Sequence, residues 1–121
     1  MVKVTGPTDP NVRLLITRLR KLSNEHNARI WRTVYEILRK PRRNRPAVNV
    51  SRINRYTKEG QVVLVPGKVL GAGVISHPVT VVALSFSENA KSKVESAGGK
   101  CYTISEYLDV NPKGSGILLM R

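Results

Sequence analysis

The chain has 121 residues, of which 40% are apolar, so we expect a single domain with a modest hydrophobic core. No apolar run approaches the roughly 20 residues that a membrane-spanning helix needs, and residues 1–10 lack the apolar stretch of a secretory signal. The single cysteine, Cys101, excludes an intramolecular disulfide and suits a reducing compartment, so a cytoplasmic protein is the expectation.

The charge is strongly positive and unevenly distributed. Lys and Arg number 21 against 8 Asp and Glu, which gives a formal net charge of +13. Residues 1–60 contain 15 basic and 4 acidic side chains, whereas residues 61–121 contain 6 and 4. Eleven of the 15 basic residues in the first half are arginines, which suit bidentate contact with phosphate. This concentration indicates an extended polyanionic partner, with nucleic acid as the first candidate and an anionic membrane surface as the second.

Two amphipathic helices are predicted near the N-terminus. Asp9 suits the N-cap of the first helix and Pro10 its first position, and apolar residues then recur at helical spacing on one face. The polar residues 24–27 interrupt the pattern. A second helix is expected over residues 28–40, because Pro41 cannot continue the hydrogen-bond ladder. In both helices arginines occupy the side opposite the apolar face.

The chain then changes character. Residues 40–46, KPRRNRP, show no periodicity and are expected to form an extended loop, after which Ser51 is placed to cap a short turn. Beyond residue 60 the pattern predicts short elements, namely strands at 62–65, 79–86 and 100–104, a helix at 87–97, a helical turn at 105–110 and a final apolar segment. The strand at 79–86 is apolar on both sides, which is typical of a strand covered on both faces.

The expected fold class is therefore mixed α/β. It comprises an irregular β-β-α core with short strands, preceded by the two amphipathic helices. We expect one domain over residues 1–121, in which residues 1–60 form a basic helical and loop region and residues 61–121 form the α/β core.

The stretch PGKVLGAGV, residues 66–74, invites comparison with phosphate-binding loops. A Walker-type loop requires Ser or Thr after its Gly-Lys pair, but Val69 follows Lys68, and position 62 is not glycine. The dinucleotide fingerprint requires Gly or Ala where this chain has Ser76, and the residues that follow do not open a helix. We interpret these glycines as supplying positive φ angles in a tight turn between two strands.

No catalytic or metal-binding pattern emerges from the remaining residues. His26 and His77 show no metal-ligand spacing, and solvated or capping roles account for both. The one close acidic pair, Glu106 and Asp109, fits a solvated helix surface, and Cys101 fits a small core residue. We predict no enzymatic activity, no cofactor and no metal. A nucleotide-dependent enzyme that uses the glycine stretch remains the competing class.

The basic region favours phosphate-backbone binding. A single cationic helix face is explained by solvation, but two faces followed by an arginine-rich loop repel one another until a polyphosphate neutralises them. Aromatic residues make up 5% of the chain, and Trp31 lies on an apolar helix face, where core packing explains it. Recognition of RNA backbone and shape is therefore expected in preference to base readout. Tyr35 and Tyr56 are candidates for stacking but are not predicted to stack.

Two stretches carry a resemblance to a known family. KVLGAG and VVALSFSENAKSKVESAGGK resemble the signature shared by the large-subunit ribosomal proteins L-fifteen of bacteria and L-eighteen-e of archaea and eukaryotes. The matching residues are Lys68, Val69, Leu70, Gly71, Gly73, Ser87, Ala90, Val94 and Gly98. The opening TDPNVRLLITRLRKLS, the flank VNVSRINRYTKEGQVVLVPGKVLG and the ending PKGSGILLMR resemble the L-eighteen-e branch, and the short length resembles its archaeal members.

The resemblance covers essentially the whole chain and implies a non-catalytic, structural component of the large subunit of the cytoplasmic ribosome. It implies large-subunit rRNA and neighbouring ribosomal proteins as partners, and no cofactor, membrane or small-molecule substrate. The signature does not identify individual rRNA contacts, because its glycines and aliphatic residues mainly specify the fold.

The candidate RNA-binding residues are therefore taken from the charge pattern. Main phosphate contacts are expected from Arg39, Lys40, Arg42, Arg43 and Arg45. Contacts from the cationic helix faces are expected from Arg13, Arg18, Arg20, Lys21, Arg29 and Arg32. Secondary contacts are expected from Arg52, Arg55, Lys68, Lys113 and Arg121. A non-ribosomal RNA-binding protein and a protein-interaction or membrane-surface adaptor are the alternatives.

Overall fold

The computed structural model describes residues 10–40 and 46–120, and these contain five helices and five strands. In chain order they are α1 (Pro10–His26), α2 (Arg29–Leu38), β1 (Ala47–Asn49), α3 (Val50–Tyr56), β2 (Val62–Leu70), β3 (Thr80–Phe86), α4 (Glu88–Ser96), β4 (Lys100–Thr103), α5 (Ile104–Val110) and β5 (Ile117–Leu119). The expected mixed α/β class with two N-terminal helices is confirmed.

All five strands of the described chain form one parallel sheet, in which β2 is central. Strand β3 pairs with β2 along one edge and with β4 along the other. The second edge of β2 is shared, because β5 pairs with residues 62–64 and β1 pairs with residues 68–70. The two halves of β2 are separated by a register shift between Val65 and Lys68. A bulge of this kind bends a strand and allows its two ends to serve different partners.

The prediction that PGKVLGAGV is a turn was wrong for its first half, since Pro66–Leu70 continue β2 as far as its end. Proline is tolerated there because the bulge leaves its nitrogen outside the ladder. Gly67 is required by close packing: a Cβ at this position would lie 1.9 Å from the carbonyl oxygen of Pro46. The connection to β3 begins only at Gly71.

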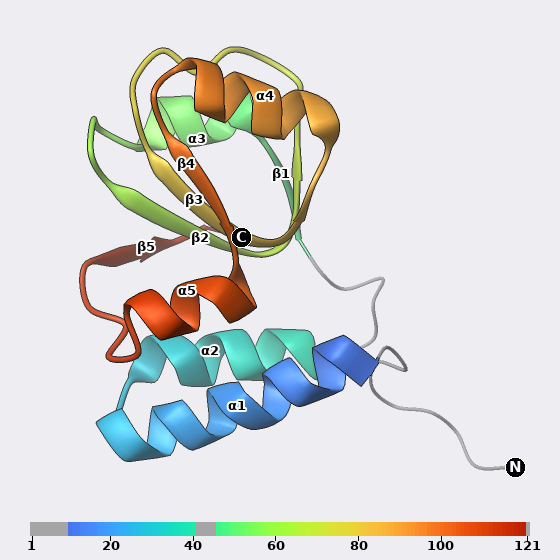
Figure 1. The fold of residues 1–121 in the computed structure, drawn as a ribbon, viewed down its shortest axis with the longest axis vertical. Coiled ribbons are helices and arrows are strands. Elements are labelled where there is room, and N and C mark those ends of the chain that lie inside the picture. The colour runs from blue at the N-terminus through green and yellow to red at the C-terminus, as the bar shows by residue number, and fades with distance from the viewer. Residues whose placement is uncertain (1–9, 41–45, 121) are drawn as a thin grey trace, which may run out of the picture.

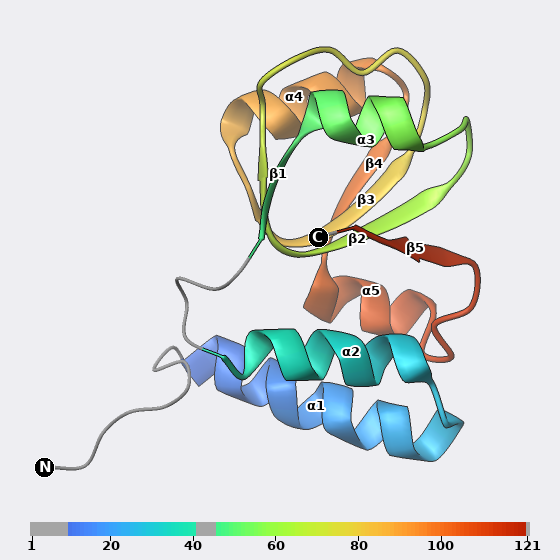
Figure 2. The same cartoon turned by 180° about the vertical axis from the view of Figure 1, so that it is seen from behind.

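Helices cover both faces of the sheet (Figures 1 and 2). On one face, α3 and α4 pack over a cluster that includes Val63, Val65 and Val81. On the other face, α5 and the α1–α2 pair pack over a cluster that includes Leu64 and Val82. Neighbouring residues of β2 and β3 thus point to opposite cores, as the doubly apolar sequence of residues 79–86 predicts.

The bounds of α4 and α5 differ from the predicted ranges by one residue, and larger differences occur at three places. Helix α1 continues through the polar residues to His26 and stops at Asn27, whose φ of 51° is a left-handed conformation that Asn tolerates at a helix end. Helix α2 ends at Leu38, short of the predicted residue 40. Ser51 lies inside α3, whose N-cap is Asn49, so the predicted capping role of Ser51 was wrong. The predicted N-cap of α1, Asp9, lies outside the described residues.

Candidate nucleic-acid interface

The α1–α2 pair separates apolar from cationic side chains. Its apolar face is buried in the core through residues such as Leu19, Trp31 and Val34, each of which is fully buried. Eight of the predicted RNA contacts lie on or directly after these two helices, which we call the α1–α2 layer. All of them except Arg18 are exposed, namely Arg13, Arg20, Lys21, Arg29, Arg32, Arg39 and Lys40. Because burial of the apolar face fixes the rotation of each helix, these cations face solvent.

Lys21 and Arg39 form ion pairs within this layer. The ammonium of Lys21 is 3.9 Å from the carboxylate of Glu25, and the guanidinium of Arg39 is 3.8 Å from that of Glu36. The guanidinium of Arg39 also lies 5.5 Å from the ring centroid of Tyr35. Pairs this long and this exposed contribute little free energy, so either cation can exchange its carboxylate for a phosphate at small cost.

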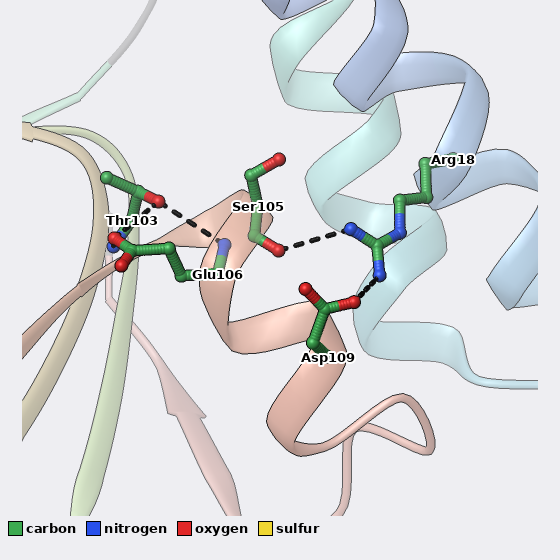
Figure 3. A network of polar contacts seen from close by, with 5 residues as sticks. All are labelled: Arg18, Thr103, Ser105, Glu106 and Asp109. Carbon is green, nitrogen blue, oxygen red and sulfur yellow. Dashed lines mark hydrogen bonds and ion pairs between the residues drawn. The ribbon is translucent and has the colours of Figure 1, made fainter.

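Arg18 is the exception, because its side chain is half-buried and reaches from α1 to α5. Its guanidinium donates to the backbone oxygen of Ser105 at 3.2 Å and forms an ion pair with Asp109 (Figure 3). Glu106, one turn earlier, accepts hydrogen bonds from the backbone and side chain of Thr103 and completes the capping box of α5. The prediction that Glu106 and Asp109 lie on a solvated helix surface is confirmed, since both are exposed. Their carboxylates also make the contacts described here, which the sequence did not predict.

The secondary contacts are spread over the molecule: Arg52 and Arg55 lie away from the α1–α2 layer, whereas Lys113 lies beside α2. Arg52 and Arg55 are exposed on α3, which lies on the opposite side of the sheet (Figures 1 and 2). Lys68 is exposed in the second half of β2. Lys113 is exposed in the segment before β5, where the oxygen of Pro112 accepts a hydrogen bond from Trp31 Nε1 at 2.7 Å. The predicted contacts thus occupy at least two separate surfaces.

Four predicted contacts lie outside the described residues, namely Arg42, Arg43, Arg45 and Arg121. Lys58 was overlooked in the sequence. It follows α3, is exposed, and extends the run of positive charge that Arg52 and Arg55 begin. Its positive charge was the available signal.

The glycine stretch presents carbonyl groups, where a phosphate loop presents N–H groups. The ammonium of Lys93, on α4, donates to the backbone oxygens of Gly71 and Gly73, both at 2.6 Å. The carbonyl of Ala72 accepts from the backbone nitrogen of Ser51 at 3.2 Å. Three consecutive carbonyls are thus used to attach the connection to α3 and α4, an arrangement of opposite polarity to an anion cradle. The predicted positive φ is found at Gly73, +100°, but not at Gly67 or Gly71, for which that prediction was wrong.

The other candidate groups have structural surroundings. His77 Nε2 lies 2.9 Å from the hydroxyl of Thr57, while His26 is exposed at the end of α1. Partial burial and, second, the nearby Glu95 carboxylate raise the pKa of the Cys101 thiol to about 11.

Across residues 10–40 and 46–120, no cluster of His, Cys, Asp and Glu is arranged to hold a metal ion. In the same ranges, every helix is too short or too polar to cross a membrane.

Known proteins show extensive similarity to this chain. A family model described as "Ribosomal protein 60S L18 and 50S L18e" matches residues 2–121. "Large ribosomal subunit protein eL18" of Methanothermobacter thermautotrophicus is 51% identical over 121 residues, which cover 100% of both chains. The protein with that name from Archaeoglobus fulgidus is 52% identical over 113 residues, 93% of this chain and 97% of its own. The one from Methanoregula boonei is 46% identical over the full length of both.

Proposed function

The chain belongs to the family of ribosomal proteins 60S L18 and 50S L18e, and from this premise we propose that α1 and α2 bind large-subunit rRNA through their exposed cationic side chains. As a member of the family it is a structural constituent of the large ribosomal subunit and not an enzyme. Its partners in that particle are ribosomal RNA and neighbouring ribosomal proteins.

The observation that supports this surface is the contrast between the two sides of the α1–α2 pair. The inner side is fully buried at Trp31 and Val34, while the outer side presents exposed arginines such as Arg20 and Arg32. Since folding already buries the apolar side against the sheet, the outer side is available to another molecule. The arginines of this outer side suit the phosphates of a folded RNA, because a guanidinium can donate two parallel N–H groups to one phosphate.

Arg18 has a different role in this proposal. Its guanidinium is engaged by Ser105 and Asp109, so transfer to a phosphate would break the contact between α1 and α5. We assign Arg18 to the fold and the exposed cations of the same helices to RNA. The predicted contacts from Arg42, Arg43 and Arg45 remain a prediction: their joint replacement by Ala should weaken RNA binding and leave thermal unfolding nearly unchanged.

A salt titration tests the proposal. The purified protein is bound to transcribed large-subunit rRNA at several salt concentrations, and the association constant K is measured at each. If phosphates are neutralised, log K falls linearly with the logarithm of the salt concentration, by about 0.7–0.9 per phosphate. An affinity that stays constant between low and moderate salt would contradict backbone binding.

A charge-matched pair of variants locates the surface. In the first variant, Arg20→Ala and Arg32→Ala remove two exposed cations of α1 and α2. In the second, Lys91→Ala and Lys100→Ala remove the same charge from exposed positions on α4 and β4. We expect the first variant to lower the salt slope by about 1.4 relative to wild type and the second to retain the wild-type slope. If the salt slope fell equally in both variants, RNA binding would depend on the net charge of the protein and not on the α1–α2 surface.

A further inference from the structure

Tyr56 differs from the other aromatic residues of the chain, because its side chain is 60% exposed. Trp31 is fully buried, and Tyr102 and Tyr107 pack against each other with ring centroids 5.6 Å apart. Tyr35 lies half-buried beneath the guanidinium of Arg39. A ring exposed to water at the end of α3 contributes little to the core, and its face is accessible to another molecule.

The backbone that carries Tyr56 is fixed on both sides. The next residue, Thr57, is buried, and its hydroxyl donates to the oxygen of Ile53 at 2.6 Å and contacts His77 Nε2 at 2.9 Å. Two residues earlier, the side-chain oxygen of Asn54 accepts from the backbone nitrogen and the hydroxyl of Ser76, both at 3.0 Å. The end of α3 is therefore attached to the connection between β2 and β3, and an exposed ring on this support is preorganised for binding.

The charge around Tyr56 is positive. Arg52 lies one helical turn before it on the same side of α3, Arg55 precedes it directly, and Lys58 follows two residues later, all of them exposed. Glu59 is the acidic residue of this segment. An aromatic ring flanked by three cations matches the chemistry of single-stranded RNA, in which a base stacks on the ring while the adjoining phosphates meet the cations.

We infer that Tyr56 is a stacking platform for an unpaired nucleobase, with Arg55 and Lys58 contacting the phosphates on either side of that nucleotide. This inference rests on the proposed rRNA binding and adds a second RNA site to it. The sheet separates α3 from the α1–α2 pair, so one molecule contacts RNA on two sides (Figure 2). The first site contacts the backbone of folded RNA, and the second holds an unpaired base.

Binding and chemical probing with transcribed large-subunit rRNA test the inference. In complex with wild-type protein, we expect one unpaired nucleotide to be protected from base-specific reagents in a manner that depends on Tyr56. Tyr56→Ala should abolish that protection and weaken binding by roughly 5- to 140-fold, the range for loss of one stacked base. Tyr56→Phe keeps the ring and should stay within about twofold of wild type. Tyr56→Leu keeps apolar bulk without a π face and should behave like Tyr56→Ala.

The outcomes separate this inference from the proposal on which it rests. Val110→Ala, at a residue that is also 60% exposed but lies on α5, is the control and should leave affinity and protection unchanged. If wild-type protein binds the rRNA and the Ala and Leu variants of Tyr56 bind equally well with unchanged protection, the stacking platform is refuted and rRNA binding stands. If wild-type protein fails to bind, the proposed function itself is refuted. Thermal unfolding of each variant confirms that the fold is intact.

Discussion

The guanidinium of Arg18 on α1 pairs with the carboxylate of Asp109 on α5, 91 residues later in the chain. A second nitrogen of the same guanidinium donates to the oxygen of Ser105 at 3.2 Å. One arginine thus joins the first helix to the last one (Figure 3). Under the proposed function, the positive charge of this region serves two purposes: Arg18 stabilises the fold, and its exposed neighbours contact phosphate.

This relationship predicts that Arg18→Ala destabilises the protein. Loss of a partly exposed ion pair and one charged hydrogen bond should lower the free energy of unfolding by about 1 kcal/mol, or the melting temperature by roughly 3–5 °C. Asp109→Asn should have a similar effect, and the double variant should be less destabilised than the sum of the two single variants. Thermal unfolding by circular dichroism measures each change.

Arg20→Ala is the control, because Arg20 is exposed on the same helix. Its melting temperature should match that of the wild type, while its affinity for rRNA should fall. The assignment of Arg18 to the fold would be wrong if Arg18→Ala left thermal unfolding unchanged and weakened RNA binding as much as Arg20→Ala does.

Gly73 and Gly60 offer a second test, since both have positive φ angles, +100° and +81°. A Cβ at Gly73 would lie 2.3 Å from the Cβ of Ser51, whereas a Cβ at Gly60 has no atom within 4 Å. Gly60→Ala should therefore cost only the backbone strain, about 1–2 kcal/mol. Gly73→Ala adds a steric clash with α3 and should cost about 2–5 kcal/mol. Urea unfolding measures the loss in free energy of unfolding for each variant. Equal losses in the two variants would contradict the close approach of Gly73 to Ser51.

The sequence predicted the elements whose periodicity is strong and local. The faces of α1 and α2 follow from apolar spacing, and the helix expected at 87–97 is α4, which begins one residue later because Ser87 is its N-cap. The strand at 79–86 was correctly expected to be covered on both faces. These features depend on neighbours within one helical turn or one strand, so residue spacing is enough to predict them.

Features that depend on distant residues were missed. The extension of β2 through Pro66 looked like a turn, because proline and glycine usually end strands. The carbonyl of Pro46, whose position requires Gly67, lies 21 residues before that glycine. The ion pair of Arg18 joins residues that no local pattern connects. Likewise, the sequence shows how much positive charge is present but not that the sheet places Arg55 and Arg32 on opposite sides.

The capping box of α5 gives a prediction on pH. The pKa of Glu106 is lowered, first by the hydrogen bond from the Thr103 backbone and then by that from the Thr103 hydroxyl. A carboxylate with a lowered pKa stabilises the native state above the pH at which it titrates when unfolded, and this contribution is lost as pH falls through its native pKa. The free energy of unfolding should therefore decrease as the pH is lowered below the ordinary carboxyl value of 4.5. Measured by urea unfolding, the free energy of unfolding of Glu106→Gln should decrease less over the same pH range. A pH profile identical to that of the wild type would show that Glu106 does not stabilise the native state through the capping box.

Cys101 gives a prediction at the alkaline end. Its thiol pKa is raised from 9.0 to about 11, mainly because partial burial against the apolar cluster under α3 and α4 disfavours the thiolate. At pH 8 the native protein should therefore contain about 100-fold less thiolate than the unfolded chain, and iodoacetamide should react about 100-fold more slowly.

The raised pKa also affects stability, because the native state holds the proton more tightly than the unfolded chain. The contribution of Cys101 is complete below pH 9 and is lost as the pH rises toward 11. Cys101→Ala removes this titration and should unfold with a flatter pH dependence between those values. Alkylation of native wild-type protein should accelerate up to about pH 11; a rate that levels off near pH 9 would show that the thiol is as accessible to water as in the unfolded chain.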